Sequence, residues 1–423
     1  MPVVQSLSKY DERIIHPGKN SVSELASRIT FDILREVPQL VAEVESGNIE
    51  KRVLEKEIIK NIDKNRYFLS SNRDELIQKV FDYMFGYWDL EQYIQDESIS
   101  DIDGIRYDYF TVKRNGRKEE IPLRFSTEQQ FDSFCKLVAI RNGGILNEND
   151  SHCRVTDEKN RLRINVSIRP RNITGPAISI RKHPKRNLGL AELEKLGMID
   201  EKLRRFFEDL ASSNANIVFC GKGAAGKTTL LRAVAGAFNA MERVLVCESD
   251  SEIYPENPNF IVQRIKKSSE GGREVTLKEL VKDGLTMSLD TYIIGEIVGD
   301  EAWEFVKAGL TGHRILATIH SQSSADVFDR LITLIKSANV DHTERTLRRM
   351  LATSIDVVVF LKKFKVAEVI EVTGYDEQND AISIARLYEL DILEEDDETI
   401  SGRFLQVESM SERLKKKLMK RGD

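Results

Sequence analysis

The stretch GKGAAGKT, residues Gly221–Thr228, decides the fold of this 423-residue chain. It fits the pattern G-x4-G-K-[ST], follows a short apolar run at 216–220 and opens a helical pattern, which is the setting of a phosphate-binding loop. The backbone N–H groups of such a loop turn inward around an anion, and the helix N-terminus adds partial positive charge. In this arrangement Lys227 contacts the β- and γ-phosphates, and the hydroxyl of Thr228 holds Mg²⁺. The sequence therefore predicts a nucleotide site, with ATP and Mg²⁺ as its ligands.

The residues on both sides of the loop alternate between short apolar strands and helical patterns. The first strands are continuous apolar runs, which is typical of a parallel sheet covered by helices on both faces. We therefore predict an α/β fold. The predicted strands are 216–220, 243–247, 291–295, 315–319, 357–361, 367–373 and 381–388. The loop residues expected to contact the nucleotide are Gly221, Lys222, Gly223, Ala224, Ala225, Gly226, Lys227, Thr228 and Thr229.

Acidic side chains follow two of these strands. DTYIIGE, residues Asp290–Glu296, is an apolar strand that ends in a carboxylate, where Glu296 can orient or activate an attacking water. Many phosphate-loop proteins carry Asp at the penultimate position of this strand, but here it is Gly295. VCESDSEI, which ends at Ile253, places Glu248 and Glu252 at the end of another strand. We predict that these carboxylates take part in catalysis.

Two histidines flank the strand that follows DTYIIGE. His313 lies in TGH before the strand, and His320 lies in TIH at its end. A lone histidine beside a strand is usually structural. For this pair, a role at a phosphate or at an interface is about as well supported as a structural one.

Farther from the loop, the N-terminal part of the chain has a different organisation. SVSE at Ser21–Glu24 is a plausible capping box, and Pro38 should break the helix that follows it. Asn115-Gly116 between alternating residues predicts a β-hairpin. We predict a helical region at 1–97, a small α+β domain at 98–183 with a helix at 127–141 and strands at 161–169 and 177–181, a linker at 184–190, a nucleotide-binding domain at 191–390 and a charged C-terminal tail at 391–423.

Composition excludes several classes of protein. The 63 Lys+Arg against 69 Asp+Glu give a net charge of −6, which argues against broad adhesion to nucleic acid. No apolar run approaches the ~18–20 residues that span a bilayer, and the first residues lack the pattern of a secretory signal, so we expect a cytoplasmic protein. The four cysteines form no CxxC pair, so we expect small buried thiols rather than a zinc ribbon or a disulfide framework.

Taken together, the motifs carry a family resemblance. The ordered set GKGAAGKTT, CESDSEI, YIIGE, TGH and ATIHS resembles the ATPases of type II and type IV secretion and of type IV pili, and is most similar to the branch that drives Flp/Tad-type pilus assembly. The segments GYWDLEQYIQDESISDID, RLRINVSIRP and ISIRK extend the resemblance over residues 75–390. It implies a RecA-like P-loop core, a homo-hexameric ring with ATP bound between two domains, and a motor that docks from the cytoplasm on a membrane-embedded platform protein.

The resemblance also implies roles for single residues. Lys227 and Thr228 correspond to the Walker A motif, and Glu296 to Walker B. Glu248 and Glu252 correspond to the acidic box, and His313 and His320 to the histidine-box region. Arginines in the N-terminal domain of the family point toward the γ-phosphate, and the residues in that stretch are Arg163, Arg169 and Arg181, of which Arg163 and Arg181 are the best candidates.

The chain also departs from the family pattern. The loop interior carries Lys222 to Ala225 where the family has GTGS, and Thr286, Ser288 and Val298 replace arginines. The TGH loop is one residue shorter, with Arg314 after the histidine, and the four-cysteine module of the type II branch is absent. Two other functions stay open: a conjugation-type DNA translocase, because conjugation machines contain close relatives, although the net charge disfavours it; and a nucleotide-sensing scaffold with little turnover, which the missing arginines allow.

Overall fold

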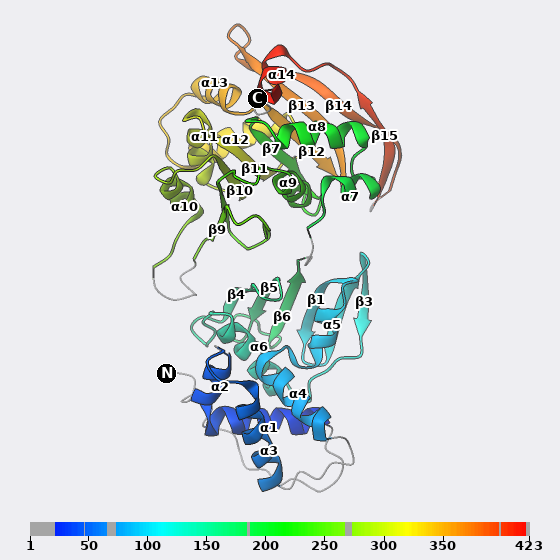
Figure 1. Cartoon of the computed structure of the whole chain (residues 1–423), viewed down its shortest axis with the longest axis vertical. Helices are drawn as coiled ribbons and strands as arrows, with labels where there is room; N and C mark the ends of the chain where they lie inside the picture. The colour runs from blue at the N-terminus through cyan, green and yellow to red at the C-terminus, as the bar shows by residue number, and fades with distance from the viewer. Residues whose placement is uncertain are drawn as a thin grey trace. The chain divides into compact units, whose positions relative to one another are not determined.

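The computed structural model describes residues 22–45, 47–65, 73–183, 187–266, 273–396 and 399–419. These residues form two compact units (Figure 1). The first contains the described residues up to Val138 together with Val166–Lys182, and the second contains Ala139–Asn165 and the described residues from His183 onward.

The N-terminal helices of the first unit pack through apolar stripes. The predicted break at Pro38 is confirmed, because α1 ends at Glu36 and Pro38 is the first residue of α2, where its missing N–H leaves no bond unmade. Ser21 of the expected capping box lies outside the described residues. The helices are α1 (Val22–Glu36), α2 (Pro38–Glu45), α3 (Lys51–Lys64), α4 (Arg73–Phe85), the 3-10 turn η1 (Trp88–Leu90) and α5 (Glu91–Gln95).

A six-stranded sheet follows in the order β3-β2-β1-β6-β5-β4. The hairpin predicted at Asn115-Gly116 is confirmed, since both residues have positive φ, 48° and 84°, between the paired ends of β2 and β3. Strands β1 and β4 lie outside the predicted segments. The elements are β1 (Ile99–Arg106), β2 (Tyr109–Arg114), β3 (Arg117–Ile121), α6 (Glu128–Arg141), β4 (His152–Asp157), β5 (Leu162–Ser167) and β6 (Ala177–Lys182).

The second unit is built on a nine-stranded sheet in the order β15-β14-β13-β12-β7-β11-β10-β8-β9. The strands from β12 to β9 in this order are parallel, and β13 to β15 extend them as antiparallel neighbours. The predicted α/β class and RecA-like core are therefore confirmed. The strands are β7 (Ile217–Gly221), β8 (Val244–Glu248), β9 (Phe260–Arg264), β10 (Thr291–Ile297), β11 (Arg314–His320), β12 (Val357–Lys362), β13 (Lys365–Asp376), β14 (Ala381–Glu395) and β15 (Ile400–Gln406).

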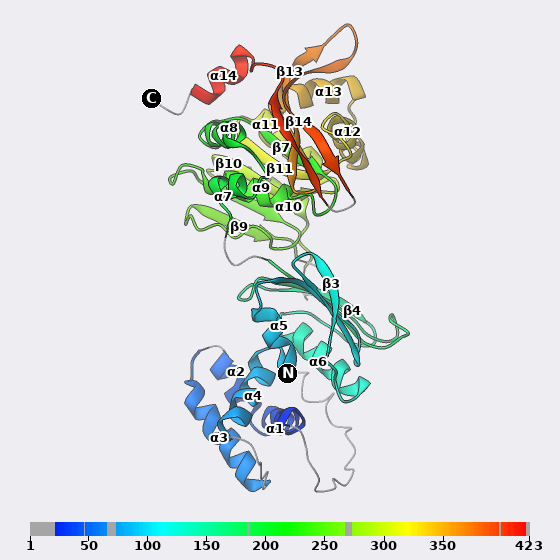
Figure 2. The same ribbon diagram turned by 90° about the vertical axis from the view of Figure 1, so that its right-hand side faces the viewer.

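Helices cover both faces of this sheet, as Figures 1 and 2 show. Alternate side chains of one strand enter different cores: Ile217 and Phe219 of β7 pack with α7, α8 and α9, whereas Val218 and Cys220 pack with α10 to α13. All four cysteines are free and buried, as predicted. The helices are α7 (Leu190–Lys195), α8 (Glu201–Ala211), α9 (Lys227–Gly236), α10 (Leu277–Gly284), α11 (Glu301–Leu310), α12 (Asp326–Ser337), α13 (Glu344–Ser354) and α14 (Glu412–Met419).

The stretch predicted as a charged tail is folded in its described part. It contains the end of β14, strand β15 and helix α14, whose Leu414 is buried in the core. Two buried carboxylates hold this helix. Asp356 accepts hydrogen bonds from Arg413 and Lys417 at 2.9 and 2.6 Å, and Glu371 accepts one from the backbone N–H of Ser411 at 2.9 Å.

Candidate nucleotide-binding site

The parallel strands bring the predicted loop, a carboxylate and a histidine to one edge of the sheet. Parallel strands end at the same edge, and Gly221 at the end of β7 is the register partner of His320 at the end of β11. Glu296 lies near the end of the neighbouring strand β10, and its Oε1 is 2.6 Å from Nε2 of His320. Both side chains are partly exposed, so they can meet a ligand held by the loop.

The loop has the backbone that its glycines permit. Gly221 has φ 147°, and a Cβ built there would lie 2.3 Å from the carbonyl oxygen of Leu361. Gly226, with φ 97°, directly precedes α9. Both positions therefore require glycine. The loop is also tied to the turn between β12 and β13, because the backbone N–H of Phe364 donates to the carbonyl of Ala225 at 3.1 Å.

Lys227 is the first residue of α9 and is buried. Its Nζ donates to the carbonyl oxygens of Gly221 and Lys222, each at 3.1 Å, so the ammonium lies across the loop. Burial lowers the pKa of Lys227, and the neighbouring Glu296 acts in the opposite direction. A phosphate in the loop would supply the anionic partner that this buried cation needs.

Glu248 and Glu252 behave differently although they are four residues apart. The carboxylate of Glu248 is buried and accepts hydrogen bonds from the backbone N–H groups of Ile253 at 3.0 Å and Glu252 at 3.1 Å. Burial raises the pKa of Glu248 to about 8, although these N–H groups and Arg232 oppose the shift. The Glu252 carboxylate is instead partly exposed and lies 3.3 Å from Nη1 of Arg163.

The raised pKa of Glu248 predicts a pH-dependent stability. The folded state keeps a proton that the unfolded state loses above its usual pKa of 4.5, so the free energy of unfolding falls as the pH rises from about 4.5 to about 8. We expect Glu248→Gln, which cannot ionise, to be more stable than the wild type at pH 8 by a few kcal/mol and not at pH 4.5. Urea denaturation at both pH values measures this. An equal difference in the free energy of unfolding between Glu248→Gln and the wild type at both pH values would contradict this prediction. Glu274→Gln, at an exposed position, is the control.

The three predicted arginines lie in different units of the structure, Arg163 in the second and Arg169 and Arg181 in the first. Arg163 lies beside the acidic residues that follow β8. Its Nη1 is 3.3 Å from the carboxylate of Glu252 and 3.7 Å from that of Asp250. Arg181 and Arg169 belong to the first unit, where they pair with carboxylates of that unit, Asp101 at 2.9 Å and Glu128 at 3.3 Å. Sequence reasoning missed Arg154, which forms an ion pair with Asp250. Arg154 alternates along β4 with Cys153 and Val155, which are buried. This alternation was the signal in the sequence that could have predicted a strand with Arg154 on its other face.

The structure does not bring His313 to the loop. His313 precedes β11 whereas His320 ends it, so the two histidines lie at opposite edges of the sheet. The His313 ring packs edge-on against Tyr292 with centroids 5.0 Å apart, and its Nδ1 is 3.1 Å from Oγ1 of Thr311. Within this chain, His313 therefore does not lie with Lys227, Glu296 and His320.

Arg314, which follows the shortened TGH loop, has a structural role. Its guanidinium is buried and donates to carbonyls at the C-terminal end of α8, Leu210 at 2.8 Å and Ala211 at 3.1 Å. It also pairs with the buried Glu242 at 3.1 Å and covers the ring of Phe238. A fixed cation at a helix C-terminus stabilises the helix dipole.

The described residues contain no group of three or more His, Cys, Asp and Glu side chains arranged to hold a metal ion. Thr228 lies directly after Lys227 in the first turn of α9. In the same described residues, none of the helices combines the length and hydropathy that crossing a membrane requires.

Comparison with known proteins places the chain in a family. A family model described as "Type II/IV secretion system protein" matches residues 148–376. A putative conjugal transfer protein of Mycobacterium tuberculosis is 29% identical over 204 residues, which cover 48% of this chain and 57% of the relative. The VirB11 protein of Agrobacterium fabrum is 30% identical over 160 residues, covering 37% and 46%. The chain thus spans about half the length of these curated relatives.

Among solved structures, the ATPase DotB of Yersinia pseudotuberculosis aligns with a TM-score of 0.48 at 18% identity, covering 75% of this chain and 80% of that one. The pilus retraction motor PilT with bound ADP aligns with a TM-score of 0.47 at 16% identity, covering 64% and 76%. The family match includes the phosphate-binding loop, the acidic box (Glu248 and Glu252), His313 and His320. It covers more than half of the 423 residues. The chain therefore belongs to the type II/IV secretion system protein family.

Proposed function

We propose that this protein binds ATP with Mg²⁺ and hydrolyses it as a motor of a secretion or pilus machine. The observation that carries the proposal is the edge of the sheet where Lys227, Glu296 and His320 come together, with the Glu296 carboxylate held 2.6 Å from His320. A phosphate loop after β7, with a carboxylate on β10 two strands away at the same edge of the sheet, is an arrangement that supports ATP hydrolysis.

The residues take separate parts in this reaction. Lys227 and the loop N–H groups bind the β- and γ-phosphates, and Thr228 would hold Mg²⁺, which neutralises charge on these phosphates when bound. Glu296 orients a water whose oxygen forms a bond to the γ-phosphorus, while the bond from that phosphorus to the β,γ-bridging oxygen breaks and leaves ADP and phosphate. His320 positions Glu296, and Arg163 is a candidate donor to the γ-phosphate.

The same proposal covers assembly and location. We assign the chain to a homo-hexameric ring in the cytoplasm, docked at the inner face of the membrane on a platform protein. For the machine, we favour Flp/Tad-type pilus assembly. The support is the order of the motifs from GKGAAGKTT to ATIHS, together with the absence of the four-cysteine module from the sequence.

A second candidate is a DNA-transfer ATPase, since one relative is named a putative conjugal transfer protein. The two functions differ in their response to DNA. A pilus motor should hydrolyse ATP at a rate that DNA does not change, and the cytoplasmic part of its platform protein should stimulate it. A DNA translocase should show DNA-stimulated turnover and binding that weakens steeply with salt.

We expect no effect of single- or double-stranded DNA on the rate of ATP turnover, since the net charge of −6 disfavours a long basic track. Turnover is measured during titration of each DNA at about 50 and 200 mM salt, a range over which phosphate contacts lose much of their affinity. A several-fold, salt-sensitive rise would favour the DNA-transfer function instead.

A further inference from the structure

The turn between β12 and β13 has a backbone that its own side chains disfavour. Lys362 pairs with Lys365 across the hairpin, so the turn consists of two residues, Lys363 and Phe364. Both have positive φ, 46° and 61°, as a type I′ turn requires. Such a turn favours Asn-Gly, because most side chains crowd their own backbone at positive φ. The local sequence thus opposes the local structure, and conflicts of this kind concentrate at functional sites.

The ring of Phe364 lies against the phosphate loop rather than in a core. The residue is 36% exposed, and it is absent from the described residues that build the two apolar cores of the second unit. A Cβ built at Gly226 would lie 3.0 Å from Cδ2 of the ring and 2.7 Å from Cε of Met198, which lies between α7 and α8. Two bulky side chains therefore pack on the backbone of Gly226, where only glycine leaves room for them.

The backbone of the same turn also holds the loop. The N–H of Phe364 donates to the carbonyl oxygen of Ala225 at 3.1 Å. The peptide bond between Ala225 and Gly226 is trans, so the N–H of Gly226 points to the opposite side of the chain from this carbonyl. Because the carbonyl is fixed toward the turn, the N–H is aimed away from it, into a loop whose amides suit an anion.

An ion pair in the same turn contributes less. Nζ of Lys363 is 2.9 Å from Oε1 of Glu395 at the end of β14, and both side chains are partly exposed. Ion pairs that water reaches add little to stability and are screened by salt. The Phe364 ring is therefore the side chain of the turn that can restrain the loop, and Lys363 provides a control for it.

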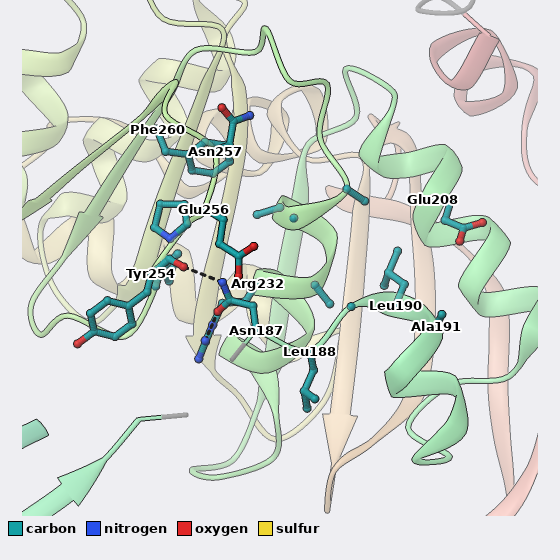
Figure 3. Close-up of a pocket in the computed structure, with 17 residues that line it drawn as sticks. Asn187, Leu188, Leu190, Ala191, Glu208, Arg232, Tyr254, Glu256, Asn257 and Phe260 are labelled. Carbon is teal, nitrogen blue, oxygen red and sulfur yellow. Dashed lines mark hydrogen bonds between the residues drawn. The ribbon is translucent and has the colours of Figure 1, made fainter. Parts of the chain in front are cut away.

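The turn is separate from the cavity of about 390 Å³ beside α9, which Figure 3 shows. Asn187 and Arg232 line this cavity, and Nδ2 of Asn187 donates to the carbonyl oxygen of Tyr254 at 2.7 Å. In the described part of the chain, no residue of the turn or of the phosphate loop belongs to the cavity wall. A change at Phe364 therefore leaves that wall intact.

We propose that Phe364 is a positioning residue for the phosphate loop, because its ring and its N–H keep the loop in the conformation that binds phosphate before nucleotide arrives. The proposal rests on the proposed function and adds to it a residue outside the motifs. A loop that is already in its binding conformation loses less entropy when a ligand enters. If removal of the ring leaves about a tenth of the molecules in that conformation, the apparent Kd rises about tenfold.

The test compares ATP with inorganic tripolyphosphate, which has the phosphates but no base, by calorimetry on the full chain. Phe364→Gly suits the positive φ and keeps the N–H but removes the ring, so it should weaken both ligands about tenfold. KM for ATP should rise by the same factor while kcat changes less than about twofold, because bound phosphates then hold the loop themselves. Phe364→Tyr, which keeps a ring, should bind both ligands as the wild type does.

Three further variants keep the test independent of folding. Phe364→Ala removes the ring without the freedom that glycine gives the backbone, so it should weaken both ligands by at least about threefold. Lys363→Asn removes the ion pair with Glu395 and should leave Kd within about twofold. Asn339→Gly, at another exposed position with positive φ, is the matched control for the backbone change. Thermal unfolding shows that each variant is folded at the temperature of the binding measurement.

The outcomes separate the possible roles of the ring. If Phe364→Gly and Phe364→Ala shifted the unfolding midpoint but left Kd for both ligands unchanged, the ring would only stabilise the fold, and the proposal would be overturned. A loss of ATP affinity with tripolyphosphate unaffected would also overturn it, because the ring would then act on the base. A wild type that binds neither ligand would instead overturn the proposed function.

Discussion

Lys227→Ala is expected to abolish measurable ATP binding, whereas Glu296→Gln is expected to bind ATP normally and lose turnover. The Lys227 ammonium lies across the loop, with its Nζ 3.1 Å from two loop carbonyls, in the position where phosphates would be held. Loss of the ammonium removes a positive charge that would contact the phosphates of bound ATP before the reaction begins. Glu296 lies on another strand beside His320, and acts on the water only as the reaction proceeds.

The two variants should affect different quantities, because Lys227 acts when ATP binds and Glu296 acts when ATP is hydrolysed. Without Lys227, ATP affinity should fall by at least a hundredfold, as expected for a lost charge-assisted contact in a partly buried site. Glu296→Gln should lower kcat by about 10²–10³ with Kd unchanged. Calorimetry gives Kd and a phosphate-release assay gives kcat.

Two surface variants, Lys202→Ala and Glu274→Gln, serve as matched controls, since both positions are exposed and lie outside the site. If Glu296→Gln hydrolysed ATP at the wild-type rate, Glu296 could not be the residue that orients the attacking water. Normal ATP affinity in Lys227→Ala would reject the loop as the phosphate site.

The second large effect concerns stability. Arg314→Met should lower the free energy of unfolding by about 3–5 kcal/mol, because the buried Glu242 loses its cation and the carbonyls at the end of α8 lose their donor. Urea denaturation of each variant gives the value from the midpoint and slope.

The double variant Arg314→Met/Glu242→Gln separates charge from packing. Removing the buried carboxylate should restore part of the loss, so the two changes should be less than additive. Strict additivity would show that the ion pair is not the reason for the loss.

The core of the fold could be predicted because its local signals agree. Strand β7 is a continuous apolar run, and the glycine pattern after it fixes the loop and the start of α9, so neither depends on distant residues. Strand β9 was missed because it is only partly buried and follows Asn257 and Pro258, which indicate a turn. Strand β15 was missed because acidic residues precede it and its side chains are largely exposed.

The candidate site was less predictable because some contacts depend on tertiary structure. The placement of His313 could have been read from the sequence, since a seven-residue strand separates its two ends by roughly 20 Å. Asn187, Arg232 and Arg314 carry no motif. Asn187 was assigned to a linker region, and its contact with Tyr254 joins residues 67 positions apart.

The attachment of α14 has a consequence for how the protein is made. A ribosome releases Asp356 and Glu371 first, and the residues that pair with these carboxylates, Ser411, Arg413 and Lys417, emerge only later. Until then, the two carboxylates lack these partners, and burying them uncompensated would be unfavourable. The second unit can therefore reach its final packing only after α14 has been synthesised, when Leu414 enters the core and the helix closes over both charges.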